Sequence, residues 1–181
     1  MNKEIEKKFL LYEDSKDYTS SFFAKYFCSI DDFISSSSQK GTLMEQGYID
    51  LKYAEDIIKV LKIKLDFEPY EFRVRKKAKK GLEECFVTFK SDGTLSRDEL
   101  EQQISLYDYG ILYDLTKGKR VVKTRLNKEI SGLTYEFDIY LDRSLIICEV
   151  EVKNESLLEK IIPMGLDITS DKKYKNKNLA K

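Results

Sequence analysis

The feature that most constrains this chain is a repeated alternation of charged and apolar side chains along short segments. In the first segment, KEIEKKFLL, Glu4, Glu6 and Lys8 fall at every second position, with Ile5 and Phe9 between or after them. Successive side chains of a strand point to opposite faces, so this pattern predicts a strand with one charged and one apolar face. It occurs eight times. The expected strands are residues 4–11, 43–50, 71–77, 85–90, 97–104, 120–126, 135–141 and 147–153.

Short turn-forming sequences separate several of these segments. Residues 91–94, Ser-Asp-Gly-Thr, lie between the fourth and fifth expected strands, and residues 128–132 lie between the sixth and seventh. Sequential strands with short links predict an antiparallel meander.

Other segments have helical spacing. An aromatic stripe at residues 22–34 predicts a helix that packs on the sheet, although a ligand pocket or a dimer contact would use the same stripe. Helices are also expected at 106–117, 156–162 and, as a basic C-terminal helix, 171–180. Residues 54–67 fit a helix that runs into a strand, and residues 35–41 predict a loop.

Composition limits the classes of function. The chain has 181 residues, which predicts a single domain over 1–181, and 32 basic against 32 acidic residues, which argues against a nucleic-acid polymer as partner. Three cysteines without motif spacing suggest reduced thiols in the cytoplasm. No run is long and apolar enough to predict a signal peptide or membrane span. The absence of histidine excludes Ser-His and Cys-His nucleophiles and makes a zinc site improbable.

The charges on the polar faces are separated by sign, since most strands carry only acids or only bases there. The simplest interpretation is a sheet whose charged face lies in water. If the eight strands instead close into a barrel with helices on its outer apolar side, the charged interior must hold water and ions. Six bases and eight acids give that interior a formal charge of −2 (6 − 8), so a polyphosphate would enter only with divalent cations.

At these residues the chain resembles the CYTH family, the triphosphate tunnel metalloenzymes. The matching strings are EIEKKFL, QGY, EFRVR, VTFK, LSRDELEQQI, KTR, YEFD, EVEV and DKKYKNKNLA, which follow one another from residue 4 to residue 180. The likeness is strongest to short bacterial members that hydrolyse inorganic triphosphate. The resemblance implies an α+β fold, in which an eight-stranded antiparallel β-barrel forms a tunnel with helices on its outside and a C-terminal helix.

The resemblance also implies roles for individual residues. It implies that Mg²⁺ or Mn²⁺ is held by Glu4, Glu6, Glu149 and Glu151, with Glu99, Glu101, Glu136 or Asp138 as additional contributors. It implies that the phosphate chain is held by Lys8, Arg73, Arg75, Lys90, Lys123 and Arg125. The attacking water would be activated by a second metal ion or by a pair formed by Lys8 and Tyr48. A packed tyrosine with a buried hydroxyl is the alternative role of Tyr48.

Several functions remain open at this stage. The leading hypothesis is a metal-dependent inorganic triphosphatase with a small-molecule substrate and no membrane partner, and the stripe at 22–34 leaves a homodimer open. Class IV adenylate cyclase and thiamine triphosphatase are alternatives within the family, although the sequence has no motif for adenine or thiamine. A polyphosphate or nucleotide sensor without catalysis is the alternative from another class.

Overall fold

The computed structural model describes residues 2–93 and 95–181, without the side chains of residues 2–4 and 36–39. The chain forms two compact units, each built from separate stretches of sequence. Unit 1 comprises Met1–Lys3, Met44–Val121 and Lys172–Lys181, and unit 2 comprises Glu4–Leu43 and Val122–Asp171. All eight expected strands are present, together with two strands of two residues each. The long strands are β1 (Asn2–Glu13), β3 (Thr42–Tyr48), β4 (Glu71–Lys79), β5 (Leu82–Lys90), β6 (Ser96–Ile104), β7 (Arg120–Ile130), β8 (Leu133–Tyr140) and β9 (Leu145–Val152).

Unit 1 is an antiparallel sheet in the order β3, β4, β5 and β6. The turn between β4 and β5 consists of Lys80 and Gly81, which both have positive φ angles, 51° and 81°. Two such residues in succession match the right-handed twist of the flanking strands. The turn therefore fixes the register in which Arg73 faces Thr88 and Glu71 faces Lys90.

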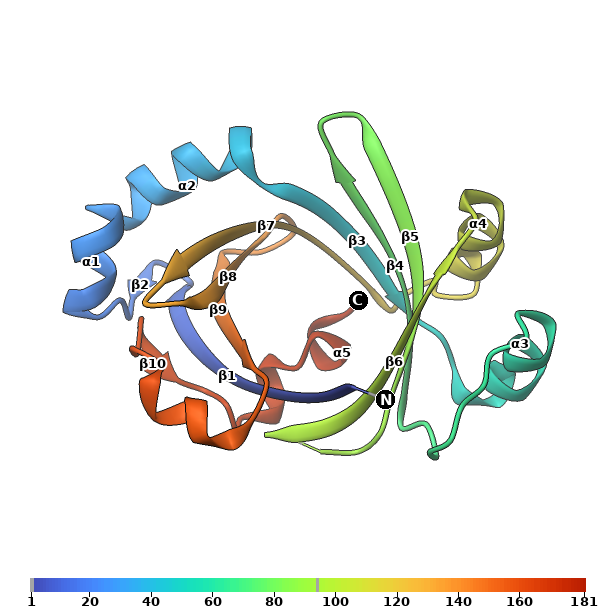
Figure 1. Ribbon diagram of the computed structural model, residues 1–181. Coiled ribbons are helices and arrows are strands. Elements are labelled where there is room, and N and C mark those ends of the chain that lie inside the picture. Colours follow the sequence, from blue (N-terminus) through green and yellow to red (C-terminus); the bar gives the residue numbers. More distant parts are fainter. Residues whose placement is uncertain (1, 94) are drawn as a thin grey trace. The chain divides into compact units, whose positions relative to one another are not determined.

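The core of unit 1 lies between this sheet and two helices, α3 (Ala54–Val60) and α4 (Leu106–Asp114), which Figure 1 shows on one side of strands β4 to β6. Phe72 and Phe89 stack with their ring centroids 4.3 Å apart. Ile57 from α3 and Leu112 from α4 belong to the same buried cluster. Because the helices cover the apolar face, the charged residues of β4, β5 and β6 share the opposite face.

Unit 2 is an antiparallel sheet in the order β7, β8, β9 and β1, and β1 also pairs the short strands β2 (Lys16–Asp17) and β10 (Leu166–Asp167). The β7–β8 turn again has two positive φ angles, 52° at Ser131 and 76° at Gly132. On the apolar face, Phe137 of β8 contacts an aromatic cluster from α1 (Ser21–Phe27) and α2 (Ile30–Lys40). These helices follow one side of the unit in Figure 1.

The aromatic stripe does not form one helix. The chain turns at Cys28, whose φ of 62° and ψ of −73° end α1. Ser29 then starts α2, because its hydroxyl accepts a hydrogen bond from the Asp32 amide at 3.1 Å. The expected loop at 35–41 was wrong, since α2 continues to Lys40. Packing of Phe33 against Phe137 holds this helix and outweighs the weak helix propensity of its serines.

Three other expectations need correction. Residues 54–67 begin as a helix, α3, but their second half forms no strand. Ile63 is buried there without strand pairing, so the alternation reflects packing of single side chains. The expected helix at 156–162 is a short 3-10 helix, η2 (Glu155–Lys160). The expected C-terminal helix is divided into η3 (Lys172–Tyr174) and α5 (Asn176–Leu179).

The predicted α+β class is confirmed, with antiparallel strands and with helices on the apolar faces of both sheets. Closure of the eight strands into one barrel concerns both units together and stays a prediction, as does the single domain over 1–181. No helix within the described residues is long and apolar enough to cross a membrane. All three cysteines are free thiols.

Candidate functional site

The charged face of unit 1 brings two arginines of β4 to one acid of β6. Glu101 accepts a hydrogen bond from Arg75 and lies 3.8 Å from an Arg73 nitrogen. Thr88, on the strand between them, donates to Glu101 at 3.0 Å and accepts from Arg73 at 3.3 Å. The register places Arg73, Thr88 and Glu101 side by side across three strands, which explains this network.

The electrostatics of this face favour charged arginine. Burial alone would lower the pKa of Arg73, but neighbouring oxygen-bearing groups outweigh burial and raise it. These groups are Tyr48, Glu99, Glu71 and Glu101. Glu101 responds in the opposite sense: burial would raise its pKa, but Arg75, Arg73 and Lys77 lower it. Both partners are therefore charged near neutral pH.

Two further predicted residues of unit 1 are also paired within the unit. Lys90 lies 2.5 Å from Glu99. Tyr48 is buried, and its hydroxyl oxygen accepts a hydrogen bond from the Gln46 side-chain amide at 2.9 Å. The predicted alternative of a packed tyrosine with a buried hydroxyl thus fits its surroundings in unit 1.

In unit 2, Lys8 of β1 joins two acids. Its Nζ atom lies 2.7 Å from Glu149 and 3.2 Å from Glu6. Lys8 faces Glu149 directly across the β1–β9 pairing, and all three side chains are buried. One ammonium group thus holds two carboxylates together.

Arg125 organises the other side of the unit 2 face. Its guanidinium donates two hydrogen bonds to Asp138, both at 2.6 Å, in the planar fork that arginine offers to a carboxylate. It also donates to Glu149 at 2.6 Å and to Glu136. Lys123 donates to Asp138 as well. The predicted basic residues of unit 2 therefore contact four of its predicted acids.

Burial affects the charges of this cluster unequally. It lowers the pKa of Lys123 to about 8, even though the carboxylate of Asp138 acts in the opposite direction. Burial would raise the pKa of Glu149, but the cations Lys8, Lys123 and Arg125 together hold it well below its usual value. Glu149 is therefore a carboxylate throughout the neutral range.

Comparisons with known proteins show what the chain is similar to. No family model matches the chain. An inorganic triphosphatase of Nitrosomonas europaea is 40% identical over 103 residues, which span 54% of this chain and 68% of that protein. An inorganic triphosphatase of Acetivibrio thermocellus is 28% identical over 100% of this chain and 95% of its own length. The crystal structure of the inorganic triphosphatase NE1496 matches 99% of this chain and 95% of its own chain, with 27% identity and a TM-score of 0.55.

The chain belongs to the CYTH family. As a CYTH protein it contains the paired acids expected from its strand pattern, and two pairs face each other directly: Glu6 opposite Glu151, and Glu136 opposite Glu149. Like charges in such positions repel each other unless a cation lies between them. In this structure Lys8 contacts Glu6, and Arg125 contacts both Glu136 and Glu149.

The acids of this CYTH chain have the donor chemistry of a Mg²⁺ or Mn²⁺ site, because carboxylate oxygens are the ligands that these hard cations prefer. Among the residues that the structure describes, no three acids or cysteines converge as a metal site. The side chain of Glu4 lies outside the described part, and Glu151 is exposed. The donors fit the metal, while the carboxylates of Glu6 and Glu149 here contact Lys8 and Arg125.

Lys8 and Tyr48 belong to different units, so their catalytic pairing stays a prediction. The strand pattern missed Glu71, Arg97 and Gln46, which lie on β4, β6 and β3. Arg97 and Glu71 continue the alternation of the charged face by two residues each, which is the signal that could have identified them.

Proposed function

We propose that this protein is a metal-dependent hydrolase that removes the terminal phosphate of inorganic triphosphate. The observation that carries the proposal is the buried guanidinium of Arg73, whose Nε donor has no hydrogen-bond acceptor within the described part of the chain. A buried donor without an acceptor is costly, and a phosphate oxygen would satisfy it. The named triphosphatase relatives support the same reaction.

In this proposal the buried bases hold the phosphate chain. Those of unit 1 are Arg73, Arg75 and Lys90, and those of unit 2 are Lys8 and Lys123, together with the partly buried Arg125. Arginine binds phosphate oxygens through two parallel hydrogen bonds, whereas lysine acts as a compact charge. The arginines therefore orient the phosphate chain, and the lysines neutralise its charge.

Carboxylates would hold the metal. Glu6, Glu149 and Glu151, with Glu4, are the proposed ligands of Mg²⁺ or Mn²⁺, and the remaining proposed contributors are Glu99, Glu101, Glu136 and Asp138. When bound, such a cation neutralises phosphate charge and makes a coordinated water more acidic. A phosphate that arrives with the metal would compete with these acids for Lys8 and Arg125.

Positioning and charge neutralisation would provide most of the rate. A water oxygen forms a bond to the terminal phosphorus, the bond to the bridging oxygen breaks, and pyrophosphate leaves. Lys8, which contacts two carboxylates, would act as a positive charge beside the phosphate chain. Tyr48 accepts a hydrogen bond from Gln46, and its pairing with Lys8 to activate the attacking water stays a prediction.

The test is orthophosphate release from tripolyphosphate, ATP and thiamine triphosphate, with Mg²⁺, with Mn²⁺ or with chelator. We expect metal-dependent turnover that is fastest on tripolyphosphate and is lost in a Glu6→Gln, Glu149→Gln variant. Glu129→Gln is the control, since Glu129 is exposed on β7 and contacts Thr134. No turnover on any substrate by a protein that tripolyphosphate still stabilises would replace the hydrolase with a phosphate sensor.

A cytoplasmic location, a homodimer and the absence of nucleic-acid and membrane partners stay predictions. The two buried thiols, Cys85 and Cys148, are compatible with a reducing compartment. A sedimentation measurement would establish the oligomeric state.

A further inference from the structure

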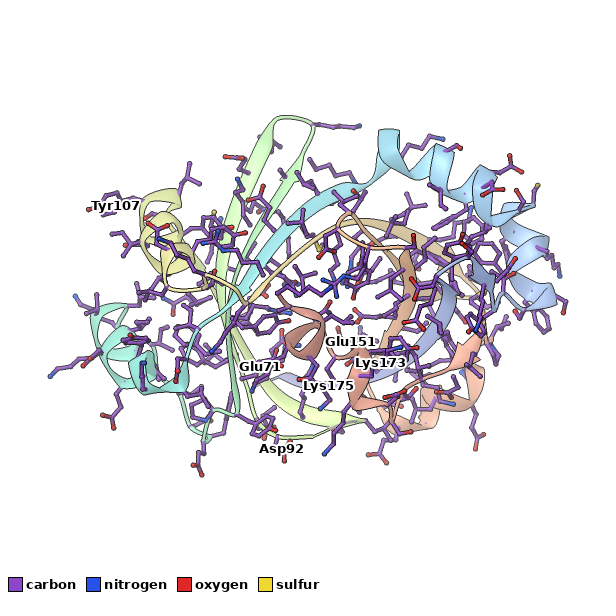
Figure 2. All side chains as sticks on the ribbon, turned by 180° about the vertical axis from the view of Figure 1, so that it is seen from behind. Glu71, Asp92, Tyr107, Glu151, Lys173 and Lys175 are labelled. Carbon is purple, nitrogen blue, oxygen red and sulfur yellow. The ribbon has the colours of Figure 1, made fainter. Side chains whose placement is uncertain are left out.

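Glu71, the first residue of β4, is an acid with only 5% of its surface exposed. Its side chain shares a face with Arg73 and Arg75, because alternate residues of a strand point the same way. Figure 2 labels Glu71, with Asp92 of the β5–β6 loop lying further out toward the edge of the molecule. A buried acid thus stands at one end of a row of proposed phosphate ligands.

Three basic residues lie at neighbouring positions of the same charged face. Arg97 of β6 lies 3.7 Å away, and its side chain is 11% exposed. Lys90 faces Glu71 directly across the β4–β5 pairing. Arg73 is the next residue on the same face, and Glu71 contributes to its raised pKa. Glu71 therefore occupies a position that is well suited to an anion.

The opposite end of this row on β4 carries a base and is more exposed. Beyond Arg75 the next residue on the face is Lys77, whose side chain is 28% exposed. The face of β4 thus runs from a buried acid, through two buried arginines, to a partly exposed lysine. A phosphate chain lying along this row would meet bases until it reaches Glu71.

We propose that the carboxylate of Glu71 fills the place of a further phosphoryl group and so limits the length of the phosphate chain that unit 1 accepts. The inference rests on the proposed function, because it concerns the same phosphate site. A carboxylate beside these cations offsets positive charge that an additional phosphoryl group would need, and its own charge repels that group. Glu71 is thus a residue that determines chain-length specificity.

The test compares tripolyphosphate with linear tetrapolyphosphate in a Glu71→Gln variant, which keeps the side-chain shape and removes the charge. The inhibition constant of tetrapolyphosphate is measured against the KM of tripolyphosphate. We expect this ratio to fall about tenfold in the variant, which corresponds to one additional charge-assisted contact. An unchanged ratio, or an equal effect on both anions, would overturn the proposal.

Arg97→Gln tests the proposal by removing a cation instead of the acid. It removes one cation beside Glu71 while the carboxylate keeps its charge, so tetrapolyphosphate should compete less well relative to tripolyphosphate. If Glu71 served only to hold Arg97, both variants would change the ratio in the same direction, and that result would contradict the proposal. If Glu71→Gln does not fold, a ratio in Arg97→Gln that stays at or below the wild-type value would overturn the proposal.

Glu68→Gln is the matched control, since Glu68 is an exposed acid three residues earlier in the same unit. Its ratio should equal that of the wild type. If the wild type hydrolyses no tripolyphosphate, the proposed function fails, and the ratio is then measured as the thermal stabilisation that each anion produces. Preferential stabilisation of Glu71→Gln by tetrapolyphosphate would still support the length limit. Binding of neither anion to any variant would overturn it.

Discussion

Lys8 and Glu149 face each other on adjacent antiparallel strands, with Nζ and Oε1 2.7 Å apart. The same ammonium group lies 3.2 Å from Glu6, so one cation links two buried acids. If these acids hold a divalent metal, as we propose, lysine and metal offer alternative neutralisation of the same negative charge. The stability of unit 2 should therefore depend on both.

Replacing Lys8 by methionine should expose this relationship. The variant leaves Glu6 and Glu149 without their shared cation, and loss of one partner from a buried ion pair costs about 3–5 kcal/mol. We expect that loss in urea unfolding with chelator, and partial recovery with Mg²⁺. Lys7→Met is the control, because the Lys7 ammonium makes only a weak contact, at 4.0 Å, with the exposed Asp167. An identical Mg²⁺ response in Lys8→Met and wild type would contradict this prediction.

Arg125 should not tolerate replacement by lysine. Its fork binds Asp138 through two hydrogen bonds and also reaches Glu149 and Glu136. Lysine keeps the charge but cannot reproduce this planar geometry, so kcat/KM on tripolyphosphate should fall about 100-fold. Arg143→Lys serves as the comparison, since Arg143 makes a similar fork with its neighbour Asp142. Equal activity of the two variants would argue against a positioning role of the guanidinium.

The strands were predictable from the sequence because their period of two is set by the pleat, and each expected strand overlaps an observed one. The helical regions were less predictable than the strands. A single residue, Cys28, divides α1 from α2 without disturbing the spacing of the aromatic side chains. The alternation through Ile63 matched a strand because buried side chains in an irregular segment can alternate as well.

The residues of the candidate site were predictable for the same reason as the strands. Residues on the expected charged face were found in that environment within each unit, because the strand pattern decides which way side chains point. Glu71 was missed because the EFRVR pattern identifies its two arginines by their charge but does not indicate that the acid before them is buried. Burial of Glu71 and its distance from Arg97 depend on β6, which is distant in the sequence.

The break between α1 and α2 predicts a stabilising substitution. Cys28 has φ 62° and ψ −73°, and the Ser29 amide donates to the Phe27 carbonyl at 2.8 Å, which is the geometry of a strained γ-turn. Glycine has no Cβ to oppose this conformation, so Cys28→Gly should raise the free energy of unfolding by about 1 kcal/mol. Cys28→Ala keeps the Cβ and should give no such gain. Equal stabilities of the two variants in urea unfolding would contradict the strain.

Tyr109 should make unit 1 sensitive to alkaline pH. Its hydroxyl is buried without a hydrogen-bond partner in the described residues, and burial, followed by Tyr113 and Glu45, raises its pKa. The folded chain therefore keeps this proton at pH values where the unfolded chain releases it, above about 10. The unfolded state binds fewer protons there, so stability is present in full below about pH 10 and falls as the pH rises further.

Tyr109→Phe removes both the ionisable group and the unpaired hydroxyl. We expect its free energy of unfolding to equal or exceed that of the wild type by about 1 kcal/mol at neutral pH, and the difference to grow above about pH 10. Tyr107→Phe, on the exposed side of the same helix, should follow the wild type at every pH. Urea unfolding across this pH range measures both variants. A difference between Tyr109→Phe and wild type that stays constant with pH would mean that the buried hydroxyl ionises as readily in the folded chain as in the unfolded one.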